Sequence, residues 1–394
     1  MRTIVKSPSV TAGRFTELDS LRGLAALTVV LHHFLIVLPA FWTRVEHPQP
    51  SPLWPIIFTP VHAFWAGREA VIFFFVLSGF VLSLPFFARP VSYPSFLVRR
   101  VCRIWIPYAV AVVAAVALSS LISRHGIAGL SAWFNGIWTT RPTAGLLLQH
   151  FALIDSFNNK VFDPVLWSLV HEMRISLVFP LLMLLVIRSN WLRVVTIGAI
   201  LSIAGSQLPV DRQDYTTSVE FLLMFAVGAL LARHRVGIAD RYRALATPVK
   251  LGLLALAMLA YTYAWWFFPF SLQLHLGFLN DWATCVGVAV FIVTAIASAR
   301  VRGVLRHPVL VAVGKASYSI YLFHAVVLLS LIYLLFPTVP IWFIWPVALV
   351  ATLAIAFLVY RTVEVPAIQL GHLLAARIEA RGYRQWVARD NRAA

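Results

Sequence analysis

The most regular feature of the sequence is a series of long apolar runs separated by short polar segments. A bilayer core about 30 Å thick requires about 20 apolar residues in a helix. About ten runs come close to this length, and those near 192–206 and 219–232 are the shortest. The runs cover 21–41, 70–87, 104–122, 164–187, 192–206, 219–232, 248–268, 276–298, 309–335 and 341–360. This pattern predicts an all-α, polytopic membrane helix bundle of about ten transmembrane helices.

The composition supports a membrane protein. Hydrophobic residues make up 60% of the chain and charged residues 12%, whereas soluble domains carry about 25% charge. The net charge of +17 raises the alternative of nucleic-acid binding, which requires a clustered basic face on a soluble domain. The arginines lie instead in short segments between apolar runs, so we expect the lipid bilayer as partner and no nucleic acid.

The distribution of Lys and Arg predicts the orientation of the bundle. Numbering the segments alternately from the N-terminus places about 23 Lys and Arg on one side and 6 on the other. Because cytoplasmic loops carry the excess of positive charge, both termini are expected in the cytoplasm and the chain in the inner (plasma) membrane as a multi-pass protein. The expected domains are a cytoplasmic segment over 1–14, a transmembrane domain over 15–366 and a basic cytoplasmic tail over 367–394.

Four polar groups lie within the apolar runs, where lipid would reject them unless they have a function. They are His33, Ser78, Glu172 and His324. Counted from the ends of their runs at 1.5 Å per residue, all four are predicted near the middle of the membrane. Hydrogen bonds between packed helices are the alternative explanation, particularly for His324 and for Ser78, which precedes Gly79.

Arg22 and His33 are eleven residues apart, which is about three helical turns, so they are predicted on one face about 16 Å apart. An anionic head bound at Arg22 and a thin arm reaching His33 would match an acyl-coenzyme A. Arg100 and Arg103, at i and i+3, would enlarge the phosphate site. Topology and headgroup anchoring are the alternative explanation for these arginines.

A histidine in this place predicts acyl transfer. A neutral imidazole at His33 is able to take a proton from an attacking hydroxyl. Glu172 is expected to orient a histidine or to compensate the imidazolium, with a buried pair to Arg174 as the alternative. Only Cys102 and Cys285 are present, which is too few for a zinc spacing motif, so no metal is predicted.

At these residues the chain resembles the acyltransferase 3 family of multispanning enzymes. The resemblance extends from 15 to 366 and includes LDSLRGLAALTVVLHHF, FFFVLSGF, RRVCRIWIPY, LWSLVHE, SYSIYLFH and RTVEVP, in that order. It implies catalytic residues His33, Glu172 and His324. It also implies donor binding by Arg22, Arg100 and Arg103, and acceptor contacts from Ser78, Trp167, Ser168 and Tyr318.

The family O-acylates sugars in polysaccharides, lipid-linked glycans and some glycosylated metabolites. The resemblance therefore implies acyl-CoA, most simply acetyl-CoA, as donor and a sugar-containing acceptor. Some members carry an additional carboxy-terminal esterase-like domain that this sequence lacks, which raises a separate outer-face acyltransferase as a possible partner. The alternative function is a multispanning transporter or flippase of a glycan or lipid-linked substrate, although no internal repeat supports it.

Overall fold

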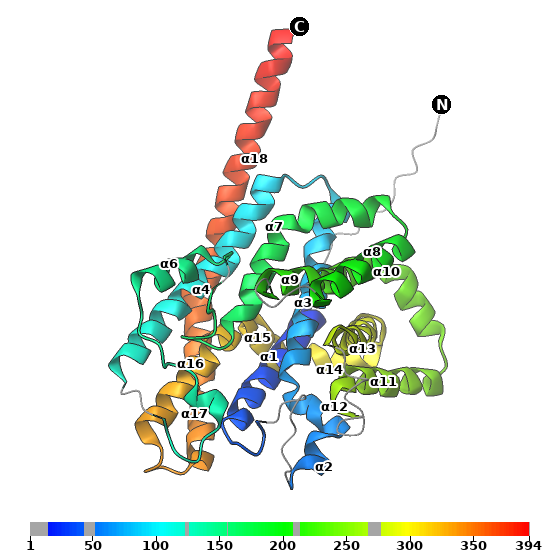
Figure 1. The fold of residues 1–394 in the computed structure, drawn as a ribbon. Helices are drawn as coiled ribbons and strands as arrows, with labels where there is room; N and C mark the ends of the chain where they lie inside the picture. The colour runs from blue at the N-terminus through cyan, green and yellow to red at the C-terminus, as the bar shows by residue number, and fades with distance from the viewer. Residues whose placement is uncertain are drawn as a thin grey trace.

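The computed structural model describes residues 15–42, 52–122, 126–155, 157–207, 213–266 and 277–393, and the predicted segment 1–14 lies outside them. Over the described residues every regular element is a helix, which confirms the all-α prediction (Figure 1). Eight of these helices are long and apolar enough to cross a membrane: Thr16–Ile36, Gly67–Ala88, Tyr93–Leu121, Leu166–Arg188, Tyr215–Ala244, Gly277–Ala297, Ser317–Leu335 and Ile341–Ala380. Two shorter apolar helices, Trp191–Gln207 and Thr247–Tyr261, bring the number close to the ten predicted.

The elements follow one another in a single bundle (Figure 1). The longer helices are α1 (Thr16–Ile36), α3 (Gly67–Ala88), α4 (Tyr93–Leu121), α7 (Leu166–Arg188), α8 (Trp191–Gln207), α10 (Leu222–Ala244), α11 (Thr247–Tyr261), α13 (Gly277–Ala297), α16 (Ser317–Leu335), α17 (Ile341–Val359) and α18 (Val365–Ala393). Short helices connect them: α2 (Trp54–Ile57), α5 (Ala132–Asn135), α6 (Ala144–Ala152), α9 (Gln213–Glu220), α12 (Tyr263–Trp266), α14 (Ala299–Leu305) and α15 (Pro308–Lys315). A 3₁₀ turn, η1 (Pro60–Trp65), precedes α3, and a π-helical turn, η4 (Tyr360–Glu364), joins α17 to α18.

The run at 309–335, predicted as one helix, is divided into α15 and α16. The division brings α15 into close contact with α1. A Cβ atom on Gly23 would lie 2.7 Å from the backbone nitrogen of Gly314, and one on Gly314 would overlap the carbonyl of Asp19. The two glycines therefore let the backbones of α1 and α15 touch. This crossing holds the part of α1 that carries Arg22.

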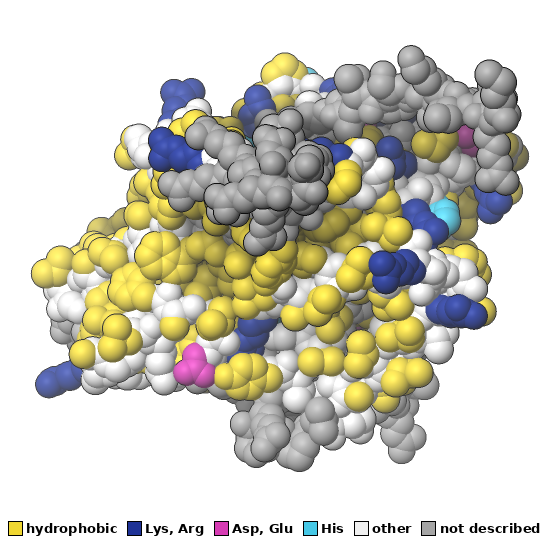
Figure 2. Space-filling model, turned by 90° about the horizontal axis from the view of Figure 1, so that it is seen from above, with side chains coloured by type: hydrophobic (Ala, Val, Ile, Leu, Met, Phe, Trp, Pro, Cys, Tyr) yellow, Lys and Arg dark blue, Asp and Glu magenta, His cyan; other side chains and the backbone are white. Residues whose placement is uncertain are grey.

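The surface of the long helices suits a hydrocarbon environment. Large apolar side chains are exposed on several of them, including Leu181 of α7 and Val350 of α17, each 67% exposed. In a bilayer such side chains face lipid and need no protein partner. Figure 2 shows the end of the bundle from which α18 projects, where Lys and Arg side chains are spread around an apolar centre.

The expected tail is part of helix α18, which begins at Val365, just before the expected start of the tail at 367. The first part of α18 packs against α4, where a Cβ on Gly371 would lie 3.1 Å from the Cβ of Cys102. Arg99 also approaches Glu379 at 3.5 Å. Beyond this contact α18 extends away from the bundle (Figure 1).

The tightest helix crossing joins α3 and α10. A Cβ atom on Gly79 would overlap the carbonyl of Phe225, and a Cβ on Gly228 would overlap the carbonyl of Val76. This contact agrees with small-residue packing at Gly79, and it holds the neighbouring Ser78 in a fixed position on α3.

We predict that Gly228→Ala destabilises the protein, because the added methyl group must displace the backbone of α3 at a cost of about 1–3 kcal/mol or more. The measurement is the thermal unfolding midpoint of the detergent-solubilised protein. Gly237→Ala on the same helix is the control, since a Cβ there would meet no atom within 4 Å. Equal midpoints for both variants would show that the crossing is not tightly packed.

Candidate functional site

Two histidines from distant parts of the chain meet between α1 and α16. Nε2 of His324 lies 3.0 Å from Nδ1 of His33, and the ring centroids are 5.0 Å apart. His324 is fully buried, whereas His33 is only partly buried. The structure therefore brings together two of the three residues predicted to be catalytic.

The hydrogen-bond pattern assigns the protons on this pair. Nδ1 of His324 lies 3.1 Å from the carbonyl oxygen of Ile320, and Nδ1 of His33 lies 3.0 Å from that of Val29. A carbonyl oxygen only accepts, so each neutral ring carries its hydrogen on Nδ1. Nε2 of His324 then accepts from His33, and Nε2 of His33 is left without a proton. This nitrogen is the one able to act as a base.

His33 lines a cavity of about 440 Å³, here called the His33 cavity. Its polar and aromatic lining residues are Trp42, Trp133, Thr139, Thr140, Asn158, Lys160 and Trp167. The ring of Trp133 packs against His33 with centroids 5.2 Å apart, and the ammonium group of Lys160 lies 5.6 Å from the centre of the Trp167 ring. The predicted substrate residue Trp167 therefore shares a cavity with His33.

The neighbouring His32 has a structural contact. Its Nδ1 lies 2.9 Å from the carbonyl oxygen of Trp65, and its ring fills the space beside Gly67. It fastens η1 to α1 and so closes one wall of the His33 cavity.

A second polar cluster joins α3, α4 and α7. Nη2 of Arg100 donates to Glu172 at 2.7 Å, and Nε of Arg100 donates to Ser176 at 3.1 Å. Ser78 donates to the same carboxylate oxygen of Glu172 at 3.2 Å. Both charged side chains are largely buried, at 8% and 17% exposure. The cluster is a buried ion pair to which two hydroxyl groups add hydrogen bonds.

This cluster opens onto a second cavity, here called the Arg22 cavity. It consists of two adjoining compartments of about 420 and 50 Å³ that share Arg22, Val81 and Arg103. Tyr318 lines the smaller compartment and donates to the carbonyl oxygen of Ile104 at 2.8 Å. Among the described residues neither Arg22 nor Arg103 forms an ion pair, although the carboxylates of Asp19 and Glu364 line the same cavity.

The Arg22 and His33 cavities are separate, so the prediction that one continuous space links Arg22 to His33 is wrong for this conformation. Along α16, Tyr321 lies between Tyr318, which lines the Arg22 cavity, and His324, which contacts His33, and we take Tyr321 with its contacts as the layer between the cavities. The hydroxyl of Tyr321 is 2.7 Å from that of Ser168, and the ring of Tyr321 packs edge-on against Phe74 with centroids 5.7 Å apart. Ser168, predicted to contact substrate, belongs to this layer and is buried.

The prediction that Glu172 orients a histidine is also wrong, because its carboxylate pairs with Arg100. The four polar groups were predicted to lie at one depth in the membrane. The structure instead forms two pairs from them, His33 with His324 and Ser78 with Glu172. Depth was counted from the ends of the helices. Ser78 and Glu172 line the small compartment together with Arg22, so they lie near the level of Arg22 rather than that of His33.

The polar segment before α7 supplies Asn158 and Lys160 to the His33 cavity, whereas His150 and Asp163 do not line it. His150 and Asp163 are fully buried. Burial raises the pKa of Asp163 to about 8 and lowers the pKa of His150. Asp163 accepts the backbone N–H of Val165 at 3.3 Å and supports the start of α7. No sequence motif identified Trp133, which lies on the short helix α5, or Lys160, which lies in the loop before α7.

Comparison with known proteins agrees with the geometry. The model of the acyltransferase 3 family, described as an acyltransferase domain, matches residues 15–361. Nodulation protein 10 of Rhizobium leguminosarum bv. viciae is 24% identical over 379 residues, which cover 93% of this chain and 96% of that protein. No solved structure matches the chain significantly.

We predict that the two cavities are reached from opposite sides of the membrane. A cysteine placed at Thr139 in the His33 cavity and one placed at Gln369 in the Arg22 cavity should react with an impermeant maleimide from opposite sides. Labelling in right-side-out and inside-out vesicles measures this. The buried Cys102 and Cys285 are first replaced by alanine, and that background is the unlabelled control. Labelling of both positions from one side would refute the arrangement.

Proposed function

The chain belongs to the acyltransferase 3 family and is a membrane acyltransferase, and we propose that it acylates a hydroxyl group using cytoplasmic acyl-CoA. The proposed acceptor is a sugar-containing molecule that enters the His33 cavity. The observation that carries this proposal is the His33–His324 pair, in which one imidazole nitrogen is left as a base at the wall of a cavity.

The proposed orientation follows from charge. The Arg22 cavity lies at the end of the bundle formed by the start of α1, the end of α3 and the start of α4, as its lining residues show. The segments joining the long helices at this end hold most of the Lys and Arg, so we place it in the cytoplasm of the plasma membrane. The His33 cavity then faces the outer side.

Arg22 and Arg103 are the proposed site for the phosphates of the donor. Planar guanidinium groups that no ion pair occupies bind phosphate oxygens through paired, charge-assisted hydrogen bonds. Ser317, the first residue of the 19-residue helix α16, lines the same cavity. The first turn of α16 already binds a carboxylate, because Ser319 donates to Glu364 at 2.8 Å, so the proposed anion site consists of the two arginines. Arg100 does not belong to this site directly, because Glu172 and Ser176 already bind its guanidinium.

The His33 cavity has the features of a carbohydrate site. Trp42, Trp133 and Trp167 offer apolar ring faces, whereas Thr139 and Asn158 offer hydrogen-bonding groups. A sugar presents both kinds of surface, since its C–H faces pack on aromatic rings and its hydroxyls require polar partners. We infer that the acceptor hydroxyl reaches Nε2 of His33 from this side.

The reaction follows from the tautomer. Nε2 of His33 takes the proton of the acceptor hydroxyl while the oxygen attacks the thioester carbonyl carbon. When the C–S bond breaks, the imidazolium returns the proton to the departing thiolate, so the products are an ester and free coenzyme A. The carbonyl oxygen of Val29 and Nε2 of His324 accept the Nδ1–H of His33 and stabilise the imidazolium. His324 is therefore a positioning residue.

The layer formed by Tyr321, Ser168 and Phe74 must open for this reaction, because it separates the proposed donor and acceptor sites. A thin arm carrying a small acyl group requires a smaller opening than a long acyl chain. This favours acetyl-CoA as donor. The proposal requires that binding of the donor, rather than thermal motion alone, opens the layer.

We predict that His33→Ala lowers kcat for acetyl transfer at least about 100-fold, which is the usual contribution of a general base. The KM for acetyl-CoA should change little, since His33 lies outside the Arg22 cavity. Release of free thiol by purified protein with acetyl-CoA and a glycoside acceptor measures this. His234→Ala, an exposed histidine on α10, is the control. Unchanged turnover in His33→Ala would remove the base assignment, and absence of thioester cleavage in the wild type would favour a transporter.

We predict that Arg22→Ala and Arg103→Ala each raise the KM for acetyl-CoA about tenfold, the effect of losing one charge-assisted contact. Arg193→Ala, an exposed arginine on α8 at the same end of the bundle, should leave the KM unchanged. Steady-state kinetics at saturating acceptor gives the comparison. If both cavity variants match the wild type, the donor binds elsewhere.

A further inference from the structure

A third cavity lies beside the Arg22 cavity, and the proposed reaction does not use it. It has a volume of about 630 Å³ and is called here the Lys315 cavity. Three cations from different segments line it: Arg306 after α14, Lys315 at the end of α15 and Arg361 in η4. Its apolar and aromatic walls include Phe357 and Tyr360. No Asp or Glu is among its lining residues.

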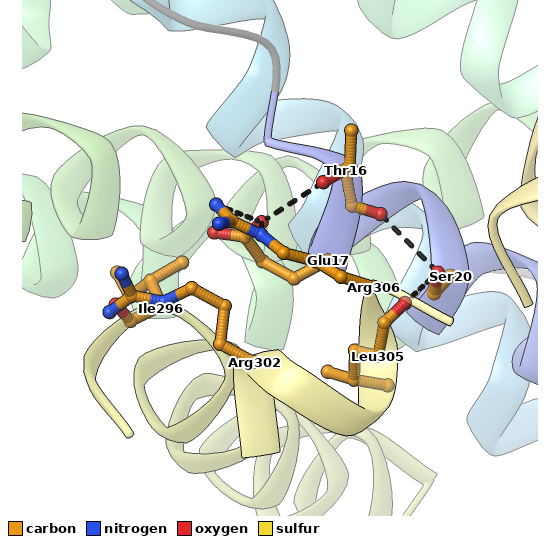
Figure 3. A network of polar contacts seen from close by, with 7 residues as sticks. All are labelled: Thr16, Glu17, Ser20, Ile296, Arg302, Leu305 and Arg306. Carbon is orange, nitrogen blue, oxygen red and sulfur yellow. Dashed lines mark hydrogen bonds and ion pairs between the residues drawn. The ribbon is translucent and has the colours of Figure 1, made fainter. Parts of the chain in front are cut away.

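One of these cations is held in place by the protein. Arg306 directs Nε and Nη2 to one carboxylate oxygen of Glu17, both at 3.2 Å, and Thr16 also reaches this carboxylate (Figure 3). Ser20 bonds to the carbonyl oxygens of Leu305 and Thr16 and ties the end of α14 to α1 (Figure 3). Arg306 and the end of α14 are therefore held against the start of α1 at the rim of the cavity.

The other two cations carry charge that the protein does not neutralise. Neither Lys315 nor Arg361 forms an ion pair within the part of the chain that the structure describes, and both are exposed. A general excess of positive charge at the cytoplasmic face would place cations anywhere around the rim. Here the cations converge on one hollow with aromatic walls, which is the lining expected for a phosphate attached to a flat or apolar group.

The Lys315 cavity adjoins the proposed donor site, because Lys315 and Tyr360 line both cavities. A ligand with phosphates at Arg22 and Arg103 is therefore able to extend past Tyr360 to Lys315. The π-helical turn η4 widens the backbone at this point and brings Tyr360 and Arg361 to the two cavities. The geometry thus connects a second phosphate site to the first.

We propose that the Lys315 cavity binds the nucleotide end of the donor, with Lys315 and Arg361 contacting the phosphate on its ribose and Tyr360 lying beside the base. This inference rests on acyl-CoA being the donor. The same phosphate chemistry would also accept the headgroup of an anionic lipid, so the experiment has to separate these two sources.

The experiment compares coenzyme A with dephospho-coenzyme A, which lacks only the ribose phosphate, as competitors of labelled acetyl-CoA. The full-length protein is placed in nanodiscs of phosphatidylcholine. The wild type should bind coenzyme A about tenfold more tightly than dephospho-coenzyme A, as expected for one charge-assisted phosphate contact. The double variant Lys315→Ala, Arg361→Ala should bind both about equally, with its affinity for dephospho-coenzyme A unchanged. Arg300→Ala, an exposed cation outside the cavity, should keep the preference.

Three results would overturn the inference. The first is a wild type that does not distinguish the two compounds. The second is a double variant that loses affinity for both equally. The third is a wild type that phosphatidylglycerol nanodiscs stabilise against heat, while the double variant is not stabilised and neither protein distinguishes the compounds; this would assign the site to a lipid headgroup. A wild type that binds no acetyl-CoA would instead remove the proposed function, so the two failures are distinguishable.

Discussion

The ion pair between Arg100 and Glu172 is the constraint on which the rest of the site depends. A charge within a membrane bundle must be paired and hydrogen-bonded, and removing one partner of a buried pair costs about 3–5 kcal/mol. Here the ion pair connects α4 to α7, and the hydrogen bond from Ser78 to Glu172 connects α3 to the same cluster. Because Glu172 neutralises Arg100, the cations of the Arg22 cavity that form no ion pair among the described residues are Arg22 and Arg103.

This arrangement separates two kinds of chemistry along α1. Phosphate binding requires positive charge, whereas a general base must be free to gain a proton, which nearby positive charge opposes. Arg22 and His33 lie about three helical turns apart, so their mutual repulsion is weak. The close crossing of α1 and α15 at Gly23 and Gly314 fixes the first end. The contact of His33 with His324 holds the other end of α1 in place.

The sequence was sufficient to predict the helical bundle and the approximate number of spans, and it placed His33 and His324 near one level without predicting that they meet. These predictions depend on run length and on polar groups that lipid rejects, and both are local properties. The predicted depth of Glu172 was wrong because counting residues along one helix gives neither the tilt of that helix nor the position at which the next helix begins. The division of 309–335 was not predictable, since it arises from the contact of Gly314 with another helix. The Lys315 cavity combines residues from three segments whose convergence only the fold creates.

The layer between the two proposed sites has an energetic consequence for transfer across a membrane. An open passage would let water and ions cross, so the layer must be closed when the donor is absent. The bond between Tyr321 and Ser168 and the ring contact with Phe74 each contribute about 1 kcal/mol. A ligand shifts the equilibrium between the closed and the open layer only by its difference in affinity for these two states. Breaking these contacts costs a few kcal/mol, which is within the binding energy of a ligand held by several phosphate contacts. Under the proposed function, the phosphate sites at one end of α1 would therefore provide the free energy that brings the acyl group to His33 at the other.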